Sequence, residues 1–287
     1  MIINWLIEPL TYAFMQRGLV AAILVGILCS VIGCYVVLRG MAFMGDALAH
    51  AILPGIAISY LLKGNLFIGA LLAAMVVALS IGFLSRRSAI KEDTAIGILF
   101  SAALSLGVAL ISTIRTYAVD LSHILFGNIL GVSSSDLLFI ALVSAIVLLI
   151  ILVLYRPFLV FSFDPILAAT MRLPVNLLHN LMLLLIALTV VVSLQTVGIG
   201  LVAALLVTPA ATAYLISRRL PVMIFYSVLF GVLSSLLGLY LSYYINIASG
   251  AAIVLVATAI FLVVFLTNPK DGVLFRAIRI HFEKKTI

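Results

Sequence analysis

Charged residues are scarce in this sequence. Of its 287 residues, 9% are Asp, Glu, Lys or Arg and 66% are hydrophobic, and the mean hydropathy is +1.41. A soluble globular domain carries about 25% charged residues, so the composition excludes that class and indicates a polytopic membrane protein. The formal net charge of +7 does not indicate nucleic-acid binding, because the basic residues lie in short runs between apolar segments.

Cysteine is also scarce. Cys29 and Cys34 lie five positions apart in one apolar segment, a spacing that fits neither a CxxC redox pair nor a disulfide framework. We interpret both as packing residues. The sequence also lacks the GxxxxGK[ST] motif of an ATP-binding P-loop and the HExxH motif of a zinc protease. The chain is therefore not expected to bind ATP through a P-loop or to act as a zinc protease, and we predict that it is not an enzyme.

Long apolar segments fill most of the chain. A helix needs about 20 mainly apolar residues to cross the hydrocarbon of a bilayer. Nine segments meet this requirement, and counts of eight or ten are also compatible with the pattern: 19–38, 41–62, 65–84, 93–112, 137–155, 175–195, 198–216, 221–243 and 250–267. We therefore predict an all-α fold in which residues 1–287 form a single transmembrane domain.

Basic residues set the expected orientation. If the segment that ends at Arg86 and Arg87 exits to the cytoplasm, thirteen Lys and Arg residues lie inside and three, namely Arg17, Lys63 and Arg115, lie outside. This bias predicts an external N-terminus and a short cytoplasmic tail at 268–287. Residues 1–17 lack the features of a secretory signal and are predicted to form an interfacial or re-entrant helix.

The segment that begins at Gly40 contains two residues that are costly in hydrocarbon, Asp46 and His50. Their spacing of four places both side chains on one helix face, where a carboxylate oxygen and an imidazole nitrogen can share a ligand. An ionised Asp near the bilayer centre costs about 2.5–3.5 kcal/mol on insertion scales, and a bound cation would offset that cost. Alternatively, the pair bonds to itself or to nearby backbone and only orders the bundle.

Neighbouring residues favour a pathway. Small residues repeat every four positions along this segment and allow another helix to approach closely: Ala47, Ala51 and Gly55. Pro54 removes a backbone hydrogen bond one turn beyond His50.

Two donors are too few for a divalent metal ion, which usually binds four to six. A two-fold dimer would bring together two copies of Asp46 and two of His50. Oxygen and imidazole donors without thiolate suit manganese, iron(II) or zinc and do not distinguish among the three.

The stretch "VVLRGMAFMGDALAHAILPGIAIS" resembles the signature segment of the membrane permeases of manganese, zinc and iron ABC importers. Four further blocks resemble later parts of that family in the same order: "KEDTAIGILFSAALSLGVALIS", "LFGNILGVS", "FSFDPILAA" and "VGIGLVAALLVTPAATA". The likeness covers nearly the whole chain, and the ordered set makes it specific.

The resemblance implies a cobalamin-importer-like fold, that of type II ABC importers, in the cytoplasmic membrane of a prokaryote. It further implies a homodimer that binds two cytoplasmic ATPase subunits and receives metal from an extracytoplasmic binding protein. Asp46 and His50 are the expected ligands on the metal path, and no cofactor is expected beyond the transported ion. Manganese is favoured, because the "HAILPG" context looks more like manganese permeases than zinc ones.

The predicted cytoplasmic segment 156–174 corresponds to the family's coupling element. Asp164 followed by Pro165 predicts a helix start, with Asp as N-cap and Pro in the first turn. The resemblance implies that Phe163, Asp164, Pro165 and Ala168 contact the ATPase. The alternative is a capped interfacial helix with no partner.

Other polar residues have simpler interpretations. Glu92 and Asp93 complement the dipole of the helix they open, and His179 is a hydrogen-bonded packing residue. Asp120 and His123 belong either to a solvated outer loop or to a metal-entry relay. A proton-coupled secondary transporter, with Asp46 and His50 as its relay, is the alternative function.

Overall fold

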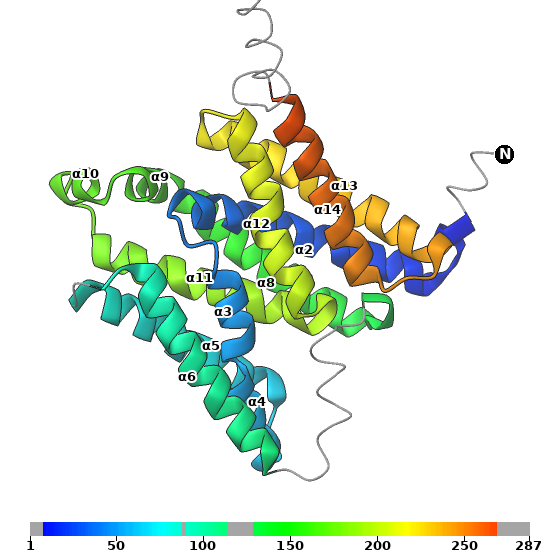
Figure 1. Cartoon of the computed structure of the whole chain (residues 1–287), viewed down its shortest axis with the longest axis horizontal. Coiled ribbons are helices and arrows are strands. Elements are labelled where there is room, and N and C mark those ends of the chain that lie inside the picture. The colour runs from blue at the N-terminus through cyan, green and yellow to red at the C-terminus, as the bar shows by residue number, and fades with distance from the viewer. Residues whose placement is uncertain (1–7, 88–89, 114–128, 269–287) are drawn as a thin grey trace, which may run out of the picture.

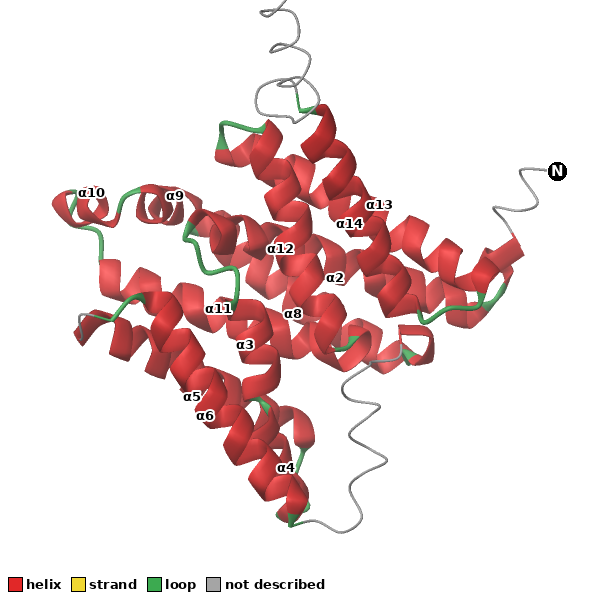
Figure 2. Cartoon of the chain, in the orientation of Figure 1, coloured by secondary structure: helices red, strands yellow, loops and turns green. Residues whose placement is uncertain are grey.

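The computed structural model of the chain describes residues 8–87, 90–113 and 129–268. All regular elements within these ranges are helices (Figure 2). Nine helices or helix pairs in this part of the chain are long and apolar enough to cross a membrane. They coincide with the nine predicted segments, so the predicted all-α polytopic fold is confirmed.

The bounds of the spans differ from the predicted ones by a few residues. The spans are α2 (Ala13–Leu38), α3 with α4 (Met44–Ala51 and Leu53–Leu61), α5 (Leu66–Arg87), α6 (Glu92–Ser112), α8 (Ser134–Val153), α11 (Val175–Val197), α12 (Ile199–Ile216), α13 (Leu220–Ile245) and α14 (Ser249–Thr267). The shorter elements are η1 (Glu8–Thr11), η2 (Ile129–Gly131), α9 (Tyr155–Phe163) and α10 (Pro165–Thr170).

The described structure can be compared with the segments predicted at the two ends of the chain. The first span begins at Ala13, so residues 13–17 of the predicted interfacial segment belong to α2 and follow the short turn η1. Residues 1–7 and the predicted tail beyond Asn268 lie outside the described residues. Asp120 and His123 lie outside them as well.

Helix α2 is the centre of the bundle and contacts α8, α11, α12 and α13 (Figure 1). Small residues bring its backbone close to α13, and buried serines of α13 bond to it. Ser227 Oγ donates to the carbonyl oxygen of Ser30 at 3.0 Å, and Ser235 Oγ donates to that of Ala22 at 3.1 Å. In a bundle whose surroundings are as apolar as its core, such close contacts and hydrogen bonds hold helices together.

The second span is interrupted at Ile52, between α3 and α4. Pro54 has no N–H to continue the helix, which accounts for the break. The predicted close approach is confirmed at Gly55, where an added Cβ would overlap the carbonyl oxygen of Gly69 in α5. At Gly45 in α3, an added Cβ would lie 2.6 Å from Leu206 Cδ2 of α12. Both halves contact α5 and α6, and α3 in addition packs against α12.

The close contact of α2 with α12 yields a stability prediction. A Cβ added at Gly33 would overlap the backbone carbonyl oxygen of Leu206, whereas one added at Gly97 in α6 would meet nothing within 4 Å. We expect Gly33→Ala to lower the free energy of unfolding by about 1–3 kcal/mol, the usual cost of overpacking. Thermal unfolding in detergent would measure it, and Gly97→Ala is the control. Equal melting temperatures for both variants would contradict this packing.

Candidate metal site and coupling segment

Asp46 and His50 lie on one face of α3, separated by one helical turn. The side chain of Asp46 is 52% exposed and that of His50 is 27% exposed. The residues between them, Ala47, Leu48 and Ala49, are buried. With Phe43, which precedes the helix and is 73% exposed, the pair forms an open stripe on an otherwise buried span. The predicted placement on one helix face is confirmed.

The ring of His50 is held by the backbone of its own helix. Its Nδ1 lies 2.9 Å from the carbonyl oxygen of Asp46 and 3.6 Å from the carboxylate Oδ1 of the same residue. A carbonyl oxygen can only accept, so Nδ1 carries the hydrogen and donates it. In the neutral imidazole the lone pair is then on Nε2, the form in which a histidine binds a metal ion.

Two neighbouring helices fix this half-span. The ring of Phe100 in α6 meets the His50 ring edge-on, at 80° and with centroids 5.7 Å apart. On another side, Gly45 faces Leu206 of α12. Edge-to-face contact limits rotation of the imidazole, so the donor atoms of the stripe have a defined direction.

One chain supplies an incomplete metal site. In the ranges that the structure describes, no three His, Cys, Asp or Glu side chains lie close enough together to hold a metal ion. Asp46 and His50 provide two donors where a divalent transition metal needs at least four. Further donors have to come from another molecule or from water, so metal binding by this pair stays a prediction.

The coupling segment has the predicted helix start. Asp164 Oδ1 accepts hydrogen bonds from the backbone N–H groups of Ile166 at 2.8 Å and Leu167 at 3.1 Å, and Pro165 opens α10. Ala168 is fully buried, so it seats α10 on the rest of the chain and does not face outward. Exposed apolar side chains surround it: Phe163, Ile166, Leu167 and Met171.

Three charged or polar residues that the sequence left separate come together at the same end of the bundle. Arg39 Nη2 lies 3.8 Å from Glu92 Oε2 and 3.4 Å from His179 Nδ1. Burial lowers the pKa of the Arg39 guanidinium, and the nearby Glu92 carboxylate opposes this shift. The sequence predicts a dipole partner at Glu92 and a packing residue at His179, because nothing local links positions so far apart. The one local signal for Arg39 is a charged residue directly after the first span.

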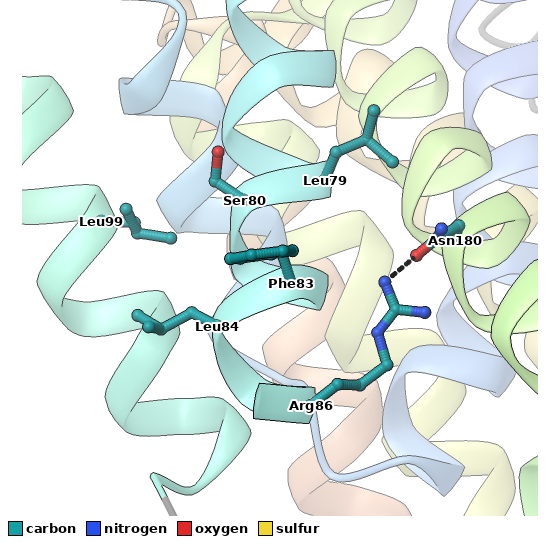
Figure 3. A pocket seen from close by; sticks show the side chains of 7 residues that line it. All are labelled: Leu79, Ser80, Phe83, Leu84, Arg86, Leu99 and Asn180. Atoms are coloured by element: carbon teal, nitrogen blue, oxygen red, sulfur yellow. Dashed lines mark hydrogen bonds between the residues drawn. The ribbon is translucent and has the colours of Figure 1, made fainter. Parts of the chain in front are cut away.

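A neighbouring pocket has different chemistry. Figure 3 shows a pocket of about 550 Å³, lined by residues of α5, α6 and α11, in which Arg86 Nη2 donates to the amide oxygen of Asn180 at 2.7 Å. The other lining residues include Leu79, Phe83 and Leu99. A guanidinium among apolar side chains repels a metal cation, so this pocket is not a metal site. Its polar contact ties the end of α5 to α11.

The comparison with known families decides the class of the protein. The model of the ABC 3 transport family matches residues 11–268. The chain belongs to this family.

Individual relatives of the family are similar over almost the full length. A protein from Halalkalibacterium halodurans described as "Manganese transport system membrane protein MntC" is 52% identical, and the match covers 94% of this chain and 92% of that protein. A protein from Haemophilus influenzae described as "Probable iron transport system membrane protein" is 41% identical over 91% of this chain and 96% of its own. The predicted resemblance to metal-ion ABC permeases is therefore confirmed.

A solved structure shares the fold. A chain of the complex "PsaBC from Streptococcus pneumoniae in complex with Fab" superposes with a TM-score of 0.84 and is 43% identical. The match covers 98% of this chain and 100% of that chain. The chain is thus a multi-pass membrane permease of the ABC 3 transport family, and the predicted permease fold is confirmed.

The cap of α10 can be tested directly. Asp164→Ala removes the acceptor for two backbone N–H groups, a loss of about 1 kcal/mol. We expect amide hydrogen exchange at Ile166 and Leu167 to become about fivefold faster, because that free energy corresponds to a factor of about five. Asp164→Asn retains a capping oxygen and should leave exchange nearly unchanged. Equal exchange in Asp164→Ala and the unmodified chain would exclude the capping role.

Proposed function

We propose that this chain is the membrane-spanning subunit of an ATP-driven importer of divalent transition-metal ions, with manganese favoured over zinc and iron(II). Two copies of the chain form the pathway. An extracytoplasmic binding protein delivers the ion, and two cytoplasmic ATPase subunits drive its passage. No cofactor is bound permanently, because the metal ion is the cargo.

The observation that carries this proposal is the open stripe of α3. A carboxylate and an imidazole whose Nδ1 bonds to its own helix lie together on the exposed face of a span whose other residues are mostly buried. If the pair only ordered the bundle, its polar atoms would be expected to pair with other helices and not to remain half-open. A cation that binds both side chains accounts for their retention in this apolar segment.

A two-fold dimer supplies the missing donors. Two α3 helices that face each other across the axis would contribute two carboxylates and two imidazoles, and water would complete the shell. An incomplete site in each chain also suits transport, because an ion must leave the site as readily as it enters. The homodimer is therefore part of the proposal and not a separate assumption.

The choice of manganese rests on the relatives. The donor set of oxygen and imidazole suits manganese, iron(II) and zinc alike. The manganese transport relative is more similar to this chain than the iron transport relative, at 52% against 41% identity. We therefore favour manganese.

Energy has to come from another chain, since this sequence has no P-loop. The exposed side chains of Phe163, Ile166, Leu167 and Met171 surround α10 with an apolar surface that fits a groove on a partner protein. The same end of the bundle carries Arg39, Arg86, Lys91, Arg218 and Arg219, and by the positive-inside rule this supports a cytoplasmic position for it. We propose α10 as the ATPase contact, with Asp164 and Pro165 shaping it and Ala168 seating it.

The metal ligands are tested by substitution. Asp46→Asn and His50→Ala should each abolish uptake of ⁵⁴Mn by the complete transporter and weaken manganese binding by more than about 100-fold. Loss of a residue that only hydrogen-bonds to a metal ligand weakens metal binding about 10–100-fold, and loss of the ligand itself should weaken it more. Asp46→Glu retains the carboxylate and should retain part of the activity.

Assembly is the control for these variants. The side chains of Asp46 and His50 are partly exposed, so their replacement should leave the dimer and its ATPase complex intact on size-exclusion chromatography. Normal uptake by both Asp46→Asn and His50→Ala would refute the site assignment.

The cargo and its energy source are tested together in cells that lack other metal importers. Uptake of ⁵⁴Mn should be inhibited more strongly by unlabelled manganese than by zinc or iron(II) at equal free concentration, and it should stop when ATP is depleted. Stronger inhibition by zinc than by manganese would identify zinc, and not manganese, as the preferred cargo. Uptake that survives ATP depletion but stops on collapse of the proton gradient would favour the proton-coupled transporter.

A further inference from the structure

Arg39 occupies a buried position between four helices. Its side chain is 14% exposed and faces a cavity of about 410 Å³ that is also lined by Glu92 of α6, Phe161 of α9, Pro165 of α10 and His179 of α11. Its guanidinium carbon lies 4.4 Å from the centre of the Phe161 ring, a cation–π contact. One side chain at the end of α2 thus contacts α6, α9 and α11 and shares a cavity with α10.

The contacts of His179 exclude a second metal site here. A guanidinium can only donate, so His179 Nδ1 accepts from Arg39 Nη2, and the ring hydrogen lies on Nε2. Glu92 Oε1 lies 3.6 Å from this Nε2. With one ring nitrogen occupied by a cation and the other protonated, His179 cannot bind a metal ion as His50 can.

The cluster is only partly satisfied in this arrangement. Arg39 Nε, Glu92 Oε1 and His179 Nε2 are buried and make no hydrogen bond within the described part of the chain. The contacts that do exist, at 3.4–3.8 Å, are longer than ordinary charge-assisted hydrogen bonds. Buried polar atoms without partners are unfavourable. Because the present contacts of Arg39 are long, a small shift that shortens its contact with one partner and lengthens that with another costs little free energy.

The position of the cluster links the coupling segment to the metal helix. Phe161 and Pro165 lie at the end of α9 and the start of α10. On the other side, Arg39 is followed by Gly40, whose φ of +71° turns the chain, and α3 begins at Met44. Arg39 thus contacts Phe161 of α9, the helix that precedes α10, and four residues of backbone separate Arg39 from α3.

We propose that Arg39 is a positioning residue that couples movement of α10 to the orientation of Asp46 and His50. As α10 moves with its ATPase partner, the guanidinium exchanges contacts among Glu92, His179 and Phe161, and α3 turns with it. The metal ion never contacts Arg39. This inference rests on the proposed function, because it requires an ATPase at α10 and an ion at α3.

The test is the number of manganese ions taken up per ATP hydrolysed, measured with the complete transporter in proteoliposomes. In Arg39→Gln this ratio should fall about tenfold, the scale of the coupling between contacting residues, while ATP hydrolysis continues. Manganese binding without ATP should stay within about twofold of the unmodified complex, because Asp46 and His50 are intact. A purely structural role would instead lower uptake and hydrolysis in parallel.

Milder variants guard against misfolding, since Arg39→Gln leaves the Glu92 carboxylate without its partner. Phe161→Leu removes only the aromatic face and should lower the ratio less than Arg39→Gln. The double variant Arg39→Gln, Glu92→Gln leaves no unpaired charge and should give the same ratio as Arg39→Gln alone, because both changes interrupt one contact.

Asp93→Asn is the matched control for Glu92→Gln. Both variants remove a carboxylate from the first turn of α6, but Asp93 is exposed and has no contact with Arg39 in the described structure. Glu92→Gln should lower the ratio and Asp93→Asn should not. Unchanged ratios in Arg39→Gln, Glu92→Gln and the double variant would overturn the coupling role while leaving the metal site intact. Failure of the unmodified complex to take up manganese, zinc or iron(II) would overturn the proposed function itself.

Discussion

A polar side chain without a partner is unfavourable inside an apolar bundle, and the partner that a histidine finds there decides which of its ring nitrogens carries the hydrogen. The two described histidines of its spans illustrate it. His50 donates from Nδ1 to a carbonyl oxygen, which leaves Nε2 able to bind a cation. His179 accepts at Nδ1 from a guanidinium, which places its hydrogen on Nε2. The same residue type thus presents an Nε2 lone pair in α3 and an Nε2 hydrogen in α11, and the difference comes from one neighbouring group.

Close packing of small residues supports both sites. Helices α2, α12 and α13 approach each other where glycine and serine replace larger side chains, as at Gly33 beside Leu206 and Ser235 beside Ala22. Because van der Waals contact and hydrogen bonding hold membrane helices together, these contacts fix α2, α12 and α13 relative to one another. The short helix α3 rests on this group of helices through Gly45, and its polar stripe faces outward from it.

Local features of the site could be predicted from the sequence, and distant ones could not. The nine spans follow from the length of apolar segments, and the shared face of Asp46 and His50 follows from a spacing of four. The N-cap at Asp164 involves residues two and three positions away. By contrast, Arg39 and His179 are 140 positions apart, and only the packing of α2 against α11 brings them together. Apolar patterning predicts that helices pack and does not predict which faces meet, so the cluster could not be anticipated.

The division of the second span into two helices bears on the proposed coupling between Arg39 and α3. Helix α4 is fixed to α5, because Gly55 and Gly69 leave no space between their backbones. Helix α3 lies between Gly40, with its positive φ, and the break at Ile52. In a continuous helix the contact of Gly55 with α5 would restrain the whole span, whereas the break gives α3 packing contacts of its own, with Leu206 of α12 and Phe100 of α6. Under the proposed coupling, the break near Pro54 separates a displacement that begins at Arg39 from the close contact of α4 with α5.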